Sequence, residues 1–436
     1  MPKALIEVYG CQMNVAEAER MAGELNQIGF SPTTSRQDAD VIILHTCCVR
    51  ESAEEKIYGK LGELKSVKRD NPAVILGITG CMAQKESEAL IKRAPHLDFV
   101  LGTGQIDELS HVVTEISDER RRIIRTELDA RSAATHGEPI RQSKTSAWVP
   151  IMYGCDNFCS YCIVPYVRGR ERSRSPQEIL AEVRAAIAVG YQEITLLGQN
   201  VNSYGKNLTD IDFADLLREV DKVDGVKRVR FMTSHPKDTD EKLLTVMAEG
   251  RHICPHIHLP VQHGSDKILR AMNRGYTAAK YLALTETIRR YLPDVALTTD
   301  IIVGFPGETE EDFRATLDLV KAVQFDAAFT FLYSPRSGTP AAKMPEQIDA
   351  DVKKRRLTEL MAVQNIIGLA KNATYEGRKV KVLVEGASKN DAAVWTGRTA
   401  TDKIVLWPHQ EEKVGDIVTV RIDKGQTWVL KGEMIN

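Results

Sequence analysis

Three short apolar runs recur in the first third of the chain, and a cysteine and a stretch with helical periodicity follow each of them. The runs lie at residues 4–9, 41–45 and 74–78, and the cysteines are Cys11, Cys47 and Cys81. Apolar runs that alternate with amphipathic segments are typical of βαβ units around a parallel sheet buried on both faces. Because sites in such sheets form beyond the carboxyl ends of the strands, we expect these cysteines, the N-terminal triad, at one sheet edge.

The same alternation of apolar and amphipathic segments resumes at Trp148 and continues through the middle of the chain. Six apolar runs lie at residues 149–153, 193–197, 229–232, 256–259, 297–303 and 327–333. Helix starts are predicted at Ser175, with Pro176 and Glu178 behind it, and more weakly at Thr309 with Asp312. Six βα units fall short of an eight-stranded barrel, so we predict a partial barrel with its working site at the carboxyl ends of the strands.

The pattern changes again after about residue 371, where short strands separated by turn residues replace the helices. These strands are predicted at residues 379–385, 402–406 and 416–422, which indicates a small antiparallel β-barrel. Residues 117–144 are charged and rich in arginine, as in a linker or an arm that crosses a surface; a merely solvated connection is the alternative. We therefore predict an α/β protein with a Rossmann-like domain (1–118), a linker (119–144), a partial β/α barrel (145–371) and a small β-barrel (372–436).

Charge and composition narrow the function classes. The 436 residues include 58 Lys and Arg against 60 Asp and Glu, a net charge of −2, which excludes a chain-wide polybasic surface but leaves room for local basic patches. The first residues, MPKALIEVYG, do not form the apolar core of a signal peptide, and no run reaches the length of a membrane span, so we expect a cytoplasmic protein. Eight cysteines in such a chain favour metal ligands or reduced thiols over disulfides.

The most specific signal is the run CDNFCSYC, which places Cys155, Cys159 and Cys162 just after a predicted strand. A loop of this length lets these cysteines, the central triad, converge on one small cluster. A 4Fe–4S cluster usually has four thiolates, so three leave one iron open to bind a substrate or cofactor. Zinc is the alternative, but no fourth ligand lies nearby in the sequence.

The N-terminal triad indicates a second cluster. Its cysteines are 36 and 34 positions apart, and each alone would be read as a buried apolar thiol. Their equivalent places after successive strands favour a cluster with one free iron instead. Cys48 adjoins Cys47, and neighbours on an extended backbone point to opposite faces, so only one of them can face the cluster; the strand register favours Cys47. Cys254 has no partner by spacing and is interpreted as a packing residue.

Eight further motifs follow one another along the chain. They are YGCQMN (9–14), TCCVRESAEEK (46–56), IVPYVRGRERSR (163–174), LLGQNVNSY (196–204), TSHP (233–236), LPVQHGS (259–265), IVGFPGET (302–309) and YSPRSGTPA (333–341). With the cysteine triads, these motifs resemble the methylthiotransferases of the radical S-adenosylmethionine (SAM) superfamily, and the C-terminal segment resembles the TRAM module. His45 departs from the family pattern, in which asparagine precedes Thr46.

The resemblance implies a radical SAM core, a TRAM-like domain and tRNA methylthiotransferase activity. The expected reaction places a methylthio group on C2 of an N6-isopentenyladenosine next to the anticodon, with SAM as both radical source and methyl donor. Two 4Fe–4S clusters are implied. The cluster of the central triad would cleave SAM reductively, and the cluster of the N-terminal triad would hold the sulfur that is transferred.

Cofactor contacts are predicted from position along the barrel. Gly198 and Gln199 end the second barrel strand, where they could hold the methionine part of SAM; an ordinary turn is the alternative. Gln262 and Asp300 lie on or beyond later strands and are predicted SAM contacts for the same reason. Tyr161 either packs near the adenine or supports the cluster loop.

RNA contact is predicted for the arginines that alternate through RGRERSR. On an extended strand, Arg168, Arg170, Arg172 and Arg174 would all point to one side and form a rail for phosphates next to the central triad. The alternative is a solvated charged loop.

The partners that we expect are the tRNA anticodon stem-loop, an electron donor such as flavodoxin or ferredoxin, and a sulfur source, with no membrane contact and a monomeric enzyme. Two related activities stay open: methylthiolation of threonylcarbamoyladenosine in tRNA, or of an aspartate in a ribosomal protein. The TSHP and LPVQHGS motifs favour the isopentenyladenosine. A third reading is an RNA-binding iron–sulfur protein without catalysis, against which two open irons argue.

Overall fold

The computed structural model describes residues 1–48, 51–119, 121–128 and 138–435. Residues 129–137 of the predicted linker lie outside this description. The chain separates into two compact units. Unit 1 comprises Met1–Gln142, Met152–Phe158 and Cys162–Ser175, and unit 2 comprises Ser143–Ile151, Cys159–Tyr161 and Pro176–Asn436.

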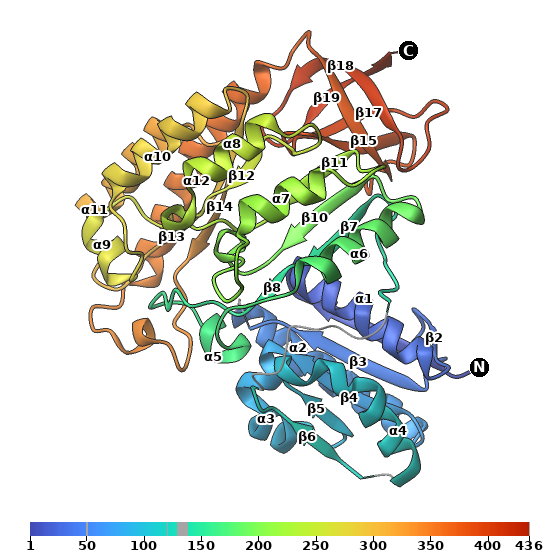
Figure 1. Cartoon of the computed structure of the whole chain (residues 1–436). Coiled ribbons are helices and arrows are strands. Elements are labelled where there is room, and N and C mark those ends of the chain that lie inside the picture. The colour runs from blue at the N-terminus through green and yellow to red at the C-terminus, as the bar shows by residue number, and fades with distance from the viewer. Residues whose placement is uncertain (49–50, 120, 129–137, 436) are drawn as a thin grey trace. The chain divides into compact units, whose positions relative to one another are not determined.

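Unit 1 is built on a six-stranded sheet with the order β2-β1-β3-β4-β5-β6, in which all neighbouring strands are parallel (Figure 1). The strands are β1 (Lys3–Tyr9), β2 (Ser31–Pro32), β3 (Val41–Thr46), β4 (Ile75–Gly80), β5 (Phe99–Leu101) and β6 (Ile123–Arg125). The prediction of a parallel-sheet N-terminal domain is confirmed. β6 lies inside the segment predicted as a linker, which therefore contributes an edge strand to this sheet.

Helices cover both faces of the sheet, which explains the consecutive apolar residues in its central strands. The helices are α1 (Gln12–Gln27), α2 (Glu51–Asp70), α3 (Cys81–Arg93) and α4 (Leu109–Glu119), with a short 3-10 turn, η1 (Thr103–Glu108). Val41 and Ile43 of β3 pack with α1 and α4, whereas Ile42 and Leu44 pack with α2 and α3. Successive residues of a strand point to opposite faces, so a sheet covered on both faces favours consecutive apolar residues in its central strands.

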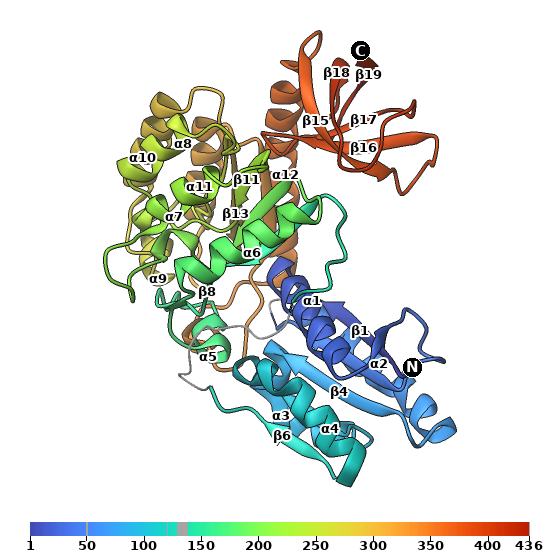
Figure 2. The same ribbon diagram turned by 45° about the vertical axis from the view of Figure 1, so that its right-hand side comes forward.

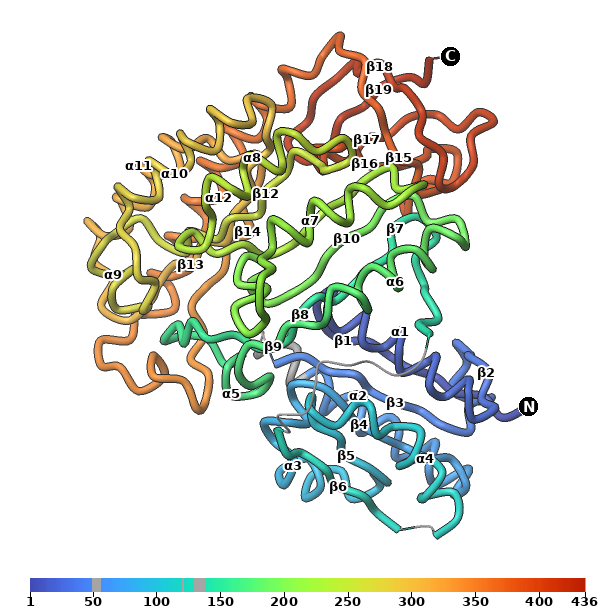
Figure 3. The backbone as a smooth tube through the Cα atoms, in the orientation of Figure 1, coloured from blue at the N-terminus to red at the C-terminus, as the bar shows by residue number. Residues whose placement is uncertain are grey.

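A short helix and a two-stranded ribbon complete unit 1. The helix is α5 (Val164–Arg168), and the ribbon pairs β8 (Met152–Tyr153) with β9 (Arg172–Ser173) in the antiparallel sense. All three elements are labelled on the backbone trace in Figure 3. Gly154 follows β8 with φ of +79°, and a Cβ atom there would lie 2.0 Å from the carbonyl oxygen of Arg170. This close approach requires glycine just before the central triad.

The larger part of unit 2 contains a partial barrel of six parallel strands. They are β7 (Ser146–Pro150), β10 (Glu193–Leu197), β11 (Arg228–Phe231), β12 (His256–His258), β13 (Ala296–Val303) and β14 (Ala327–Leu332). The strands form the sheets β11-β10-β7 and β12-β13-β14, and a parallel bridge from Val229 to Ile253 lies between them. The predicted six-unit partial barrel is confirmed.

Helices surround these strands, as Figure 2 shows. They are α6 (Pro176–Ala188), α7 (Phe213–Asp221), α8 (Glu241–Glu249), α9 (Asp266–Ala271), α10 (Ala278–Tyr291), α11 (Glu310–Val323) and α12 (Ala350–Ala373), with the short turns η2 (Val201–Ser203), η3 (Pro236–Asp238) and η4 (Pro340–Lys343). Thr309 caps α11: its side chain accepts from the Asp312 N–H and the Asp312 side chain accepts from Thr309 in return, which confirms the weaker of the two predicted helix starts.

The C-terminal part of unit 2 is a closed five-stranded barrel with the order β15-β16-β17-β19-β18. Its strands are β15 (Lys379–Ala387), β16 (Val394–Thr399), β17 (Ile404–Pro408), β18 (Ile417–Gly425) and β19 (Leu430–Ile435). Val382, Trp407 and Leu430 are buried in its core. The predicted small β-barrel is confirmed, and closure leaves no free sheet edge. Its strand pairs are antiparallel as predicted, except that β17 and β19 pair in parallel where they close the barrel.

The described part of the chain contains no helix with both the length and the apolar character needed to cross a membrane.

Candidate active site

The N-terminal triad lies at the carboxyl ends of three neighbouring strands of unit 1. Cys11 follows β1 as the N-cap of α1, Cys47 follows β3, and Cys81 begins α3 directly after β4. The Cys47 N–H donates to the Tyr9 carbonyl oxygen at 2.9 Å, so the end of β3 stays in register with the end of β1. β1 and β3 flank the point where the strand order reverses, which is where doubly wound sheets place their sites.

The three thiols of this triad contact one another. Hydrogen bonds with Cys11 and Cys81 raise the pKa of Cys47, whereas the hydrogen bond with Cys47 lowers the pKa of Cys11 to about 6 and also lowers that of Cys81. Arg168 lowers the pKa of both Cys11 and Cys81 further. Cys47 and Cys81 are buried and Cys11 is exposed, so the three sulfurs form a site that opens on one side. Converging thiolates are the donors that an iron–sulfur cluster needs.

The structure also separates Cys47 from its neighbour. Cys47 hydrogen-bonds both other members of the triad. Cys48 contacts Cys81 and packs in an apolar cluster with Ile163 and Val167. Of the two neighbours, only Cys47 therefore contacts both the cysteine that follows β1 and the cysteine that follows β4.

A buried polar network extends from the triad into unit 1. The Arg168 guanidinium donates to both carboxylate oxygens of Glu17, at 2.5 and 2.9 Å, and each side chain is 5% exposed. Glu17 Oε2 lies 3.1 Å from His45 Nε2, and His45 Nδ1 lies 2.7 Å from the Thr79 hydroxyl. Burial works against ionisation of Glu17, but Arg168 and His45 together lower its pKa, so the carboxylate is charged.

Two members of this network, Asn14 and His45, have roles that sequence reasoning did not find. Asn14, in the YGCQMN motif, accepts from the Cys11 N–H at 3.4 Å and donates to the Thr46 carbonyl oxygen at 3.2 Å. His45, the departure from the family pattern, lies at the centre of the network and is fully buried. Glu17 carried no signal in the sequence, because a single glutamate on an amphipathic helix is normally exposed.

The predicted rail of four arginines is corrected by the structure. The segment is not an extended strand, because residues 164–168 form α5 and only Arg172–Ser173 is in a strand. Arg168 and Arg174 are 5% and 3% exposed, and buried side chains do not contact a phosphate backbone. Arg170 is 72% exposed and pairs with Asp156 at 3.2 Å, and Arg172 is half-buried.

The loop of the central triad is divided between the units, with Cys155 and Cys162 in unit 1 and Cys159 in unit 2. In unit 1 the Cys155 N–H donates to the Gly169 carbonyl oxygen at 3.2 Å, and the Asn157 amide donates to the Cys155 sulfur at 3.4 Å. Cys155 and Cys162 are half-buried and Cys159 is buried. None of the three forms a disulfide, so each sulfur could serve as a cluster ligand.

In unit 2 the same loop is held by hydrogen bonds. The Ser160 N–H donates to the Met272 carbonyl oxygen at 3.0 Å, and the Ser160 hydroxyl donates to the Ala271 carbonyl oxygen at 2.7 Å. Arg274, which sequence reasoning missed, donates to the Cys159 sulfur and to the Tyr161 hydroxyl oxygen, both at 3.4 Å. Tyr161 packs with an apolar cluster that includes Phe305 and Tyr333. These contacts favour support of the loop as the role of Tyr161.

Polar atoms without partners gather at the carboxyl ends of β10 and β11. Gln199 Oε1, Asn200 Oδ1 and Ser234 Oγ are buried and have no hydrogen-bond partner among the described residues. Such atoms normally find a partner, so they fit a polar ligand at this end of the barrel. The backbone is also strained here, because Thr233 and Gln262 have φ of +70° and +68°. Gly198 is half-buried beside Gln199.

Gln262 and Asp300 come from neighbouring segments of the barrel. The Gln262 N–H donates to the Asp300 carbonyl oxygen at 2.8 Å, and the Asp300 carboxylate lies 3.5 Å from His258 Nε2. Asp300 pairs across the sheet with Phe329, whose ring is 55% exposed and meets His258 edge to face. An accessible carboxylate and an open aromatic ring thus lie on one face of the barrel strands.

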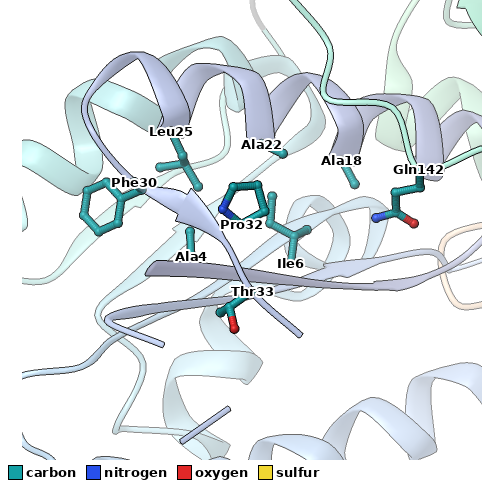
Figure 4. Close-up of a pocket in the computed structure, with 9 residues that line it drawn as sticks. All are labelled: Ala4, Ile6, Ala18, Ala22, Leu25, Phe30, Pro32, Thr33 and Gln142. Carbon is teal, nitrogen blue, oxygen red and sulfur yellow. The ribbon is translucent and has the colours of Figure 1, made fainter. Parts of the chain in front are cut away.

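A cavity elsewhere in unit 1 does not belong to either triad. It measures about 60 Å³ and lies between α1, β1 and β2 (Figure 4). Its walls are mainly small or apolar side chains: Ala4, Ile6, Ala18, Ala22, Leu25, Phe30, Pro32, Thr33 and Gln142. Sites for cofactors or nucleosides measure about 300–1,000 Å³, so this cavity is too small for SAM.

Comparisons with protein families match most of the chain. Residues 3–102 match the model described as "Uncharacterized protein family UPF0004", residues 149–320 match the "Radical SAM superfamily", and residues 373–435 match the TRAM domain. Two curated relatives are named tRNA-2-methylthio-N(6)-dimethylallyladenosine synthase. The one from Carboxydothermus hydrogenoformans is 51% identical, and the one from Moorella thermoacetica is 50% identical; each match covers 99% of this chain and 98% of the relative.

Solved structures share the fold at low sequence identity. The radical SAM methyltransferase TsrM from Kitasatospora setae matches with a TM-score of 0.57 and 14% identity, over 85% of this chain and 90% of that one. The cobalamin-dependent radical SAM enzyme OxsB matches with a TM-score of 0.54 and 12% identity, over 84% of this chain and 56% of that one. These likenesses concern the fold alone.

Membership of the radical SAM superfamily implies a 4Fe–4S cluster and SAM as cofactors, and the TRAM domain supports tRNA binding. The three cysteines of the central triad, none of them in a disulfide, fit the cluster, and the partnerless polar atoms at the carboxyl ends of β10 and β11 fit SAM. Identity near 50% over the whole length extends the likeness to every part of the molecule. The chain therefore belongs to the radical SAM methylthiotransferases, in the family whose curated members are named tRNA-2-methylthio-N(6)-dimethylallyladenosine synthase.

Proposed function

We propose that this enzyme places a methylthio group on C2 of an N6-isopentenyladenosine beside the anticodon of tRNA, with SAM as radical source and methyl donor. The observation that carries the proposal is the pair of cysteine triads, each beyond the carboxyl end of parallel strands, in a chain about half identical to relatives of that name. An aromatic C–H bond of this kind is not broken by acid or base catalysis. Radical chemistry supplied by bound cofactors is therefore required.

In this proposal the central triad, Cys155, Cys159 and Cys162, ligates the cluster that works with SAM. Three thiolates leave one iron open to the cofactor. Arg274 is 5% exposed, and its guanidinium donates to the Cys159 sulfur. Its role is to hold the loop and to offset negative charge on the sulfurs.

The N-terminal triad, Cys11, Cys47 and Cys81, ligates the second 4Fe–4S cluster, which would hold the sulfur to be transferred. Support comes from the hydrogen bonds that join Cys47 to Cys11 and Cys81 and from the buried Arg168 beside Cys11 and Cys81, since ligating cysteines must be thiolates and a cation favours them. The exposed position of Cys11 leaves the site open on one side. We expect a sulfur source and an electron donor such as flavodoxin or ferredoxin to come from outside the chain.

SAM is proposed to bind across the carboxyl ends of β10 to β13. Gly198 offers close backbone approach, and Gln199, Gln262 and Asp300 offer an amide or a carboxylate to its polar groups. Support comes from the partnerless Gln199 oxygen and from the accessible Asp300 carboxylate, which is 29% exposed. Tyr161 contributes as a support of the cluster loop.

The tRNA anticodon stem-loop is proposed to contact Arg170 and Arg172 together with the TRAM domain. Arg170 is the most accessible of the four predicted arginines. The domain bounds in this proposal are 1–118 for the methylthiotransferase domain, 145–371 for the radical SAM core and 372–436 for the TRAM-like domain. The enzyme would act as a cytoplasmic monomer.

The test is anaerobic incubation of the reconstituted enzyme with reductant, SAM and isopentenylated tRNA, followed by mass spectrometry of the nucleosides. We expect a methylthio adduct on the isopentenyladenosine, abolished in Cys11→Ala and in Cys155→Ala. Cys254→Ala is the matched control, because this thiol is buried in unit 2 and belongs to neither triad. It should retain the activity.

Other outcomes separate the alternatives. An adduct on threonylcarbamoyladenosine or on a ribosomal-protein aspartate would keep the radical enzyme and replace its substrate. Absence of deoxyadenosine after reduction with SAM would leave only an RNA-binding iron–sulfur protein. Either result would contradict the proposal.

A further inference from the structure

The buried arginine of α5 lies next to the N-terminal triad, and its surroundings assign it a role that RNA contact does not explain. We propose that Arg168 is a positioning residue of the N-terminal triad: its guanidinium, oriented by Glu17, hydrogen-bonds the Cys81 sulfur and sets the reduction potential of the cluster bound there. The inference rests on the proposed function, because it requires a cluster at this triad.

The geometry fixes the guanidinium in one orientation. Arg168 and Glu17 meet through two hydrogen bonds of 2.5 and 2.9 Å, with both side chains 5% exposed. Such a fork leaves little freedom for the planar guanidinium. His45 approaches Glu17 from the other side, at 3.1 Å, so the carboxylate is held as well.

The charge of Arg168 reaches the sulfurs of the triad. The guanidinium hydrogen-bonds Cys81 and acts on it electrostatically, and it acts electrostatically on Cys11. Burial of a cation is costly without compensation, and the thiolates and Glu17 provide it. A cluster with thiolate ligands gains negative charge on reduction, so a fixed cation beside it favours the reduced form. Hydrogen bonds to the sulfurs and buried charge are the means by which proteins tune such clusters.

The same residue ties α5 to the N-terminal sheet. α5 begins shortly after Cys162 of the central triad, and Ile163 and Val167 pack on Cys48 and Cys81. The Thr103 hydroxyl donates to the Val167 carbonyl oxygen. Within unit 1, residues 163–168, which directly follow Cys162, therefore pack against the N-terminal triad, and Arg168 is the charged residue at the end of this segment.

The experiment measures the midpoint potential of the N-terminal cluster alone. The parent is the full chain with Cys155, Cys159 and Cys162 changed to alanine, reconstituted with iron and sulfide and titrated with reductant by electron paramagnetic resonance. Arg168→Met removes the charge at similar volume, and Arg168→Lys keeps it. The matched control is Arg36→Met, which breaks another two-bond Arg–Glu pair of unit 1, with Glu7 at 2.5 and 2.7 Å.

We expect Arg168→Met to shift the midpoint potential to a more negative value at unchanged iron content. Arg168→Lys should restore most of the difference, and Arg36→Met should match the parent. An unchanged potential in Arg168→Met with a full iron content would overturn the inference.

If Arg168→Met fails to fold, a second variant still tests the effect of the Arg168 charge on the midpoint potential. Glu17→Gln keeps the guanidinium but removes its negative partner, so the potential should move in the opposite direction, to a less negative value. A shift to a more negative value would contradict the charge account. A parent that binds no iron would instead refute the second cluster of the proposed function, which distinguishes the two failures.

Discussion

Substitution of Arg230 by methionine tests how the terminal β-barrel is held on the catalytic barrel. Arg230 lies on β11 with its side chain 6% exposed, and its Nε donates to Glu193 Oε2 at 2.8 Å. Its remaining nitrogens donate to the carbonyl oxygens of Ala400, at 3.0 Å, and Thr399, at the end of β16. One buried side chain thus joins two strands of the catalytic barrel to the backbone of the TRAM domain.

The expected loss of unfolding free energy follows from the polar groups that Arg230→Met leaves without a partner. Glu193 is 8% exposed and would remain as a buried, unpaired charge. The carbonyl oxygens of Ala400 and Thr399 would each lose one donor, although that of Thr399 would keep the Asp402 N–H. Removal of one partner from a buried ion pair costs about 3–5 kcal/mol. In the double variant Arg230→Met/Glu193→Met the charge is gone, and the loss of the donors alone costs about 1–3 kcal/mol. The single variant should therefore be less stable than the double variant.

The assay is urea unfolding followed by tryptophan fluorescence, to which Trp407 in the core of the TRAM barrel contributes. Arg218→Met is the control, because Arg218 is 41% exposed and its pair with Asp215 at 3.4 Å should contribute less than about 1 kcal/mol. Equal stability of Arg230→Met and Arg218→Met would refute the reasoning. A double variant less stable than the single variant would refute it as well.

Three further predictions concern the site and its surroundings. Arg274→Met should lower the yield of deoxyadenosine from SAM at least tenfold, since Cys159 and Tyr161 lose their shared donor. Arg289→Met is the control: this arginine does not contact the loop of the central triad, so the yield should stay unchanged. Gly154→Ala should halve the iron content, because its Cβ would lie 2.0 Å from the Arg170 carbonyl oxygen at a φ of +79°; a full iron content would contradict this. Burial lowers the pKa of His256 from 6.5 to about 4. Between these pH values the imidazole is protonated in the unfolded chain but stays neutral in the folded chain. Stability is therefore fully present above pH 6.5 and falls by about 2 kcal/mol at pH 5, a loss that His256→Gln should remove in urea titrations at both pH values.

The order of strands and helices was predictable because each element has its own local spacing of apolar residues in the sequence. Apolar runs such as residues 41–45 and 193–197 identify strands buried on both faces, and cysteines at their ends identify the sheet edge that carries chemistry. The β6 strand was missed because it is an edge strand of three residues, Ile123–Arg125, inside a charged segment. An edge strand needs few apolar side chains and leaves a weak pattern.

The roles of the buried arginines could not be predicted from local patterns. The alternation in RGRERSR suggested an extended strand, but Pro165 at the start of α5 and the apolar Ile163 and Val167 were the available signals for a helix. Arg274 lies 115 positions from the cysteine that it contacts, so only the tertiary fold brings the two together. A charged residue is normally expected at the surface, which makes buried arginines the least predictable members of the site.

Iron analysis of three reconstituted chains tests the central claim, that each cysteine triad binds its own cluster. The account predicts about eight iron atoms for the unchanged chain, from two four-iron clusters, and about four when either triad is replaced by alanine. About four irons in the unchanged chain, lost completely with the central triad and unaffected by replacement of the N-terminal triad, would contradict the account.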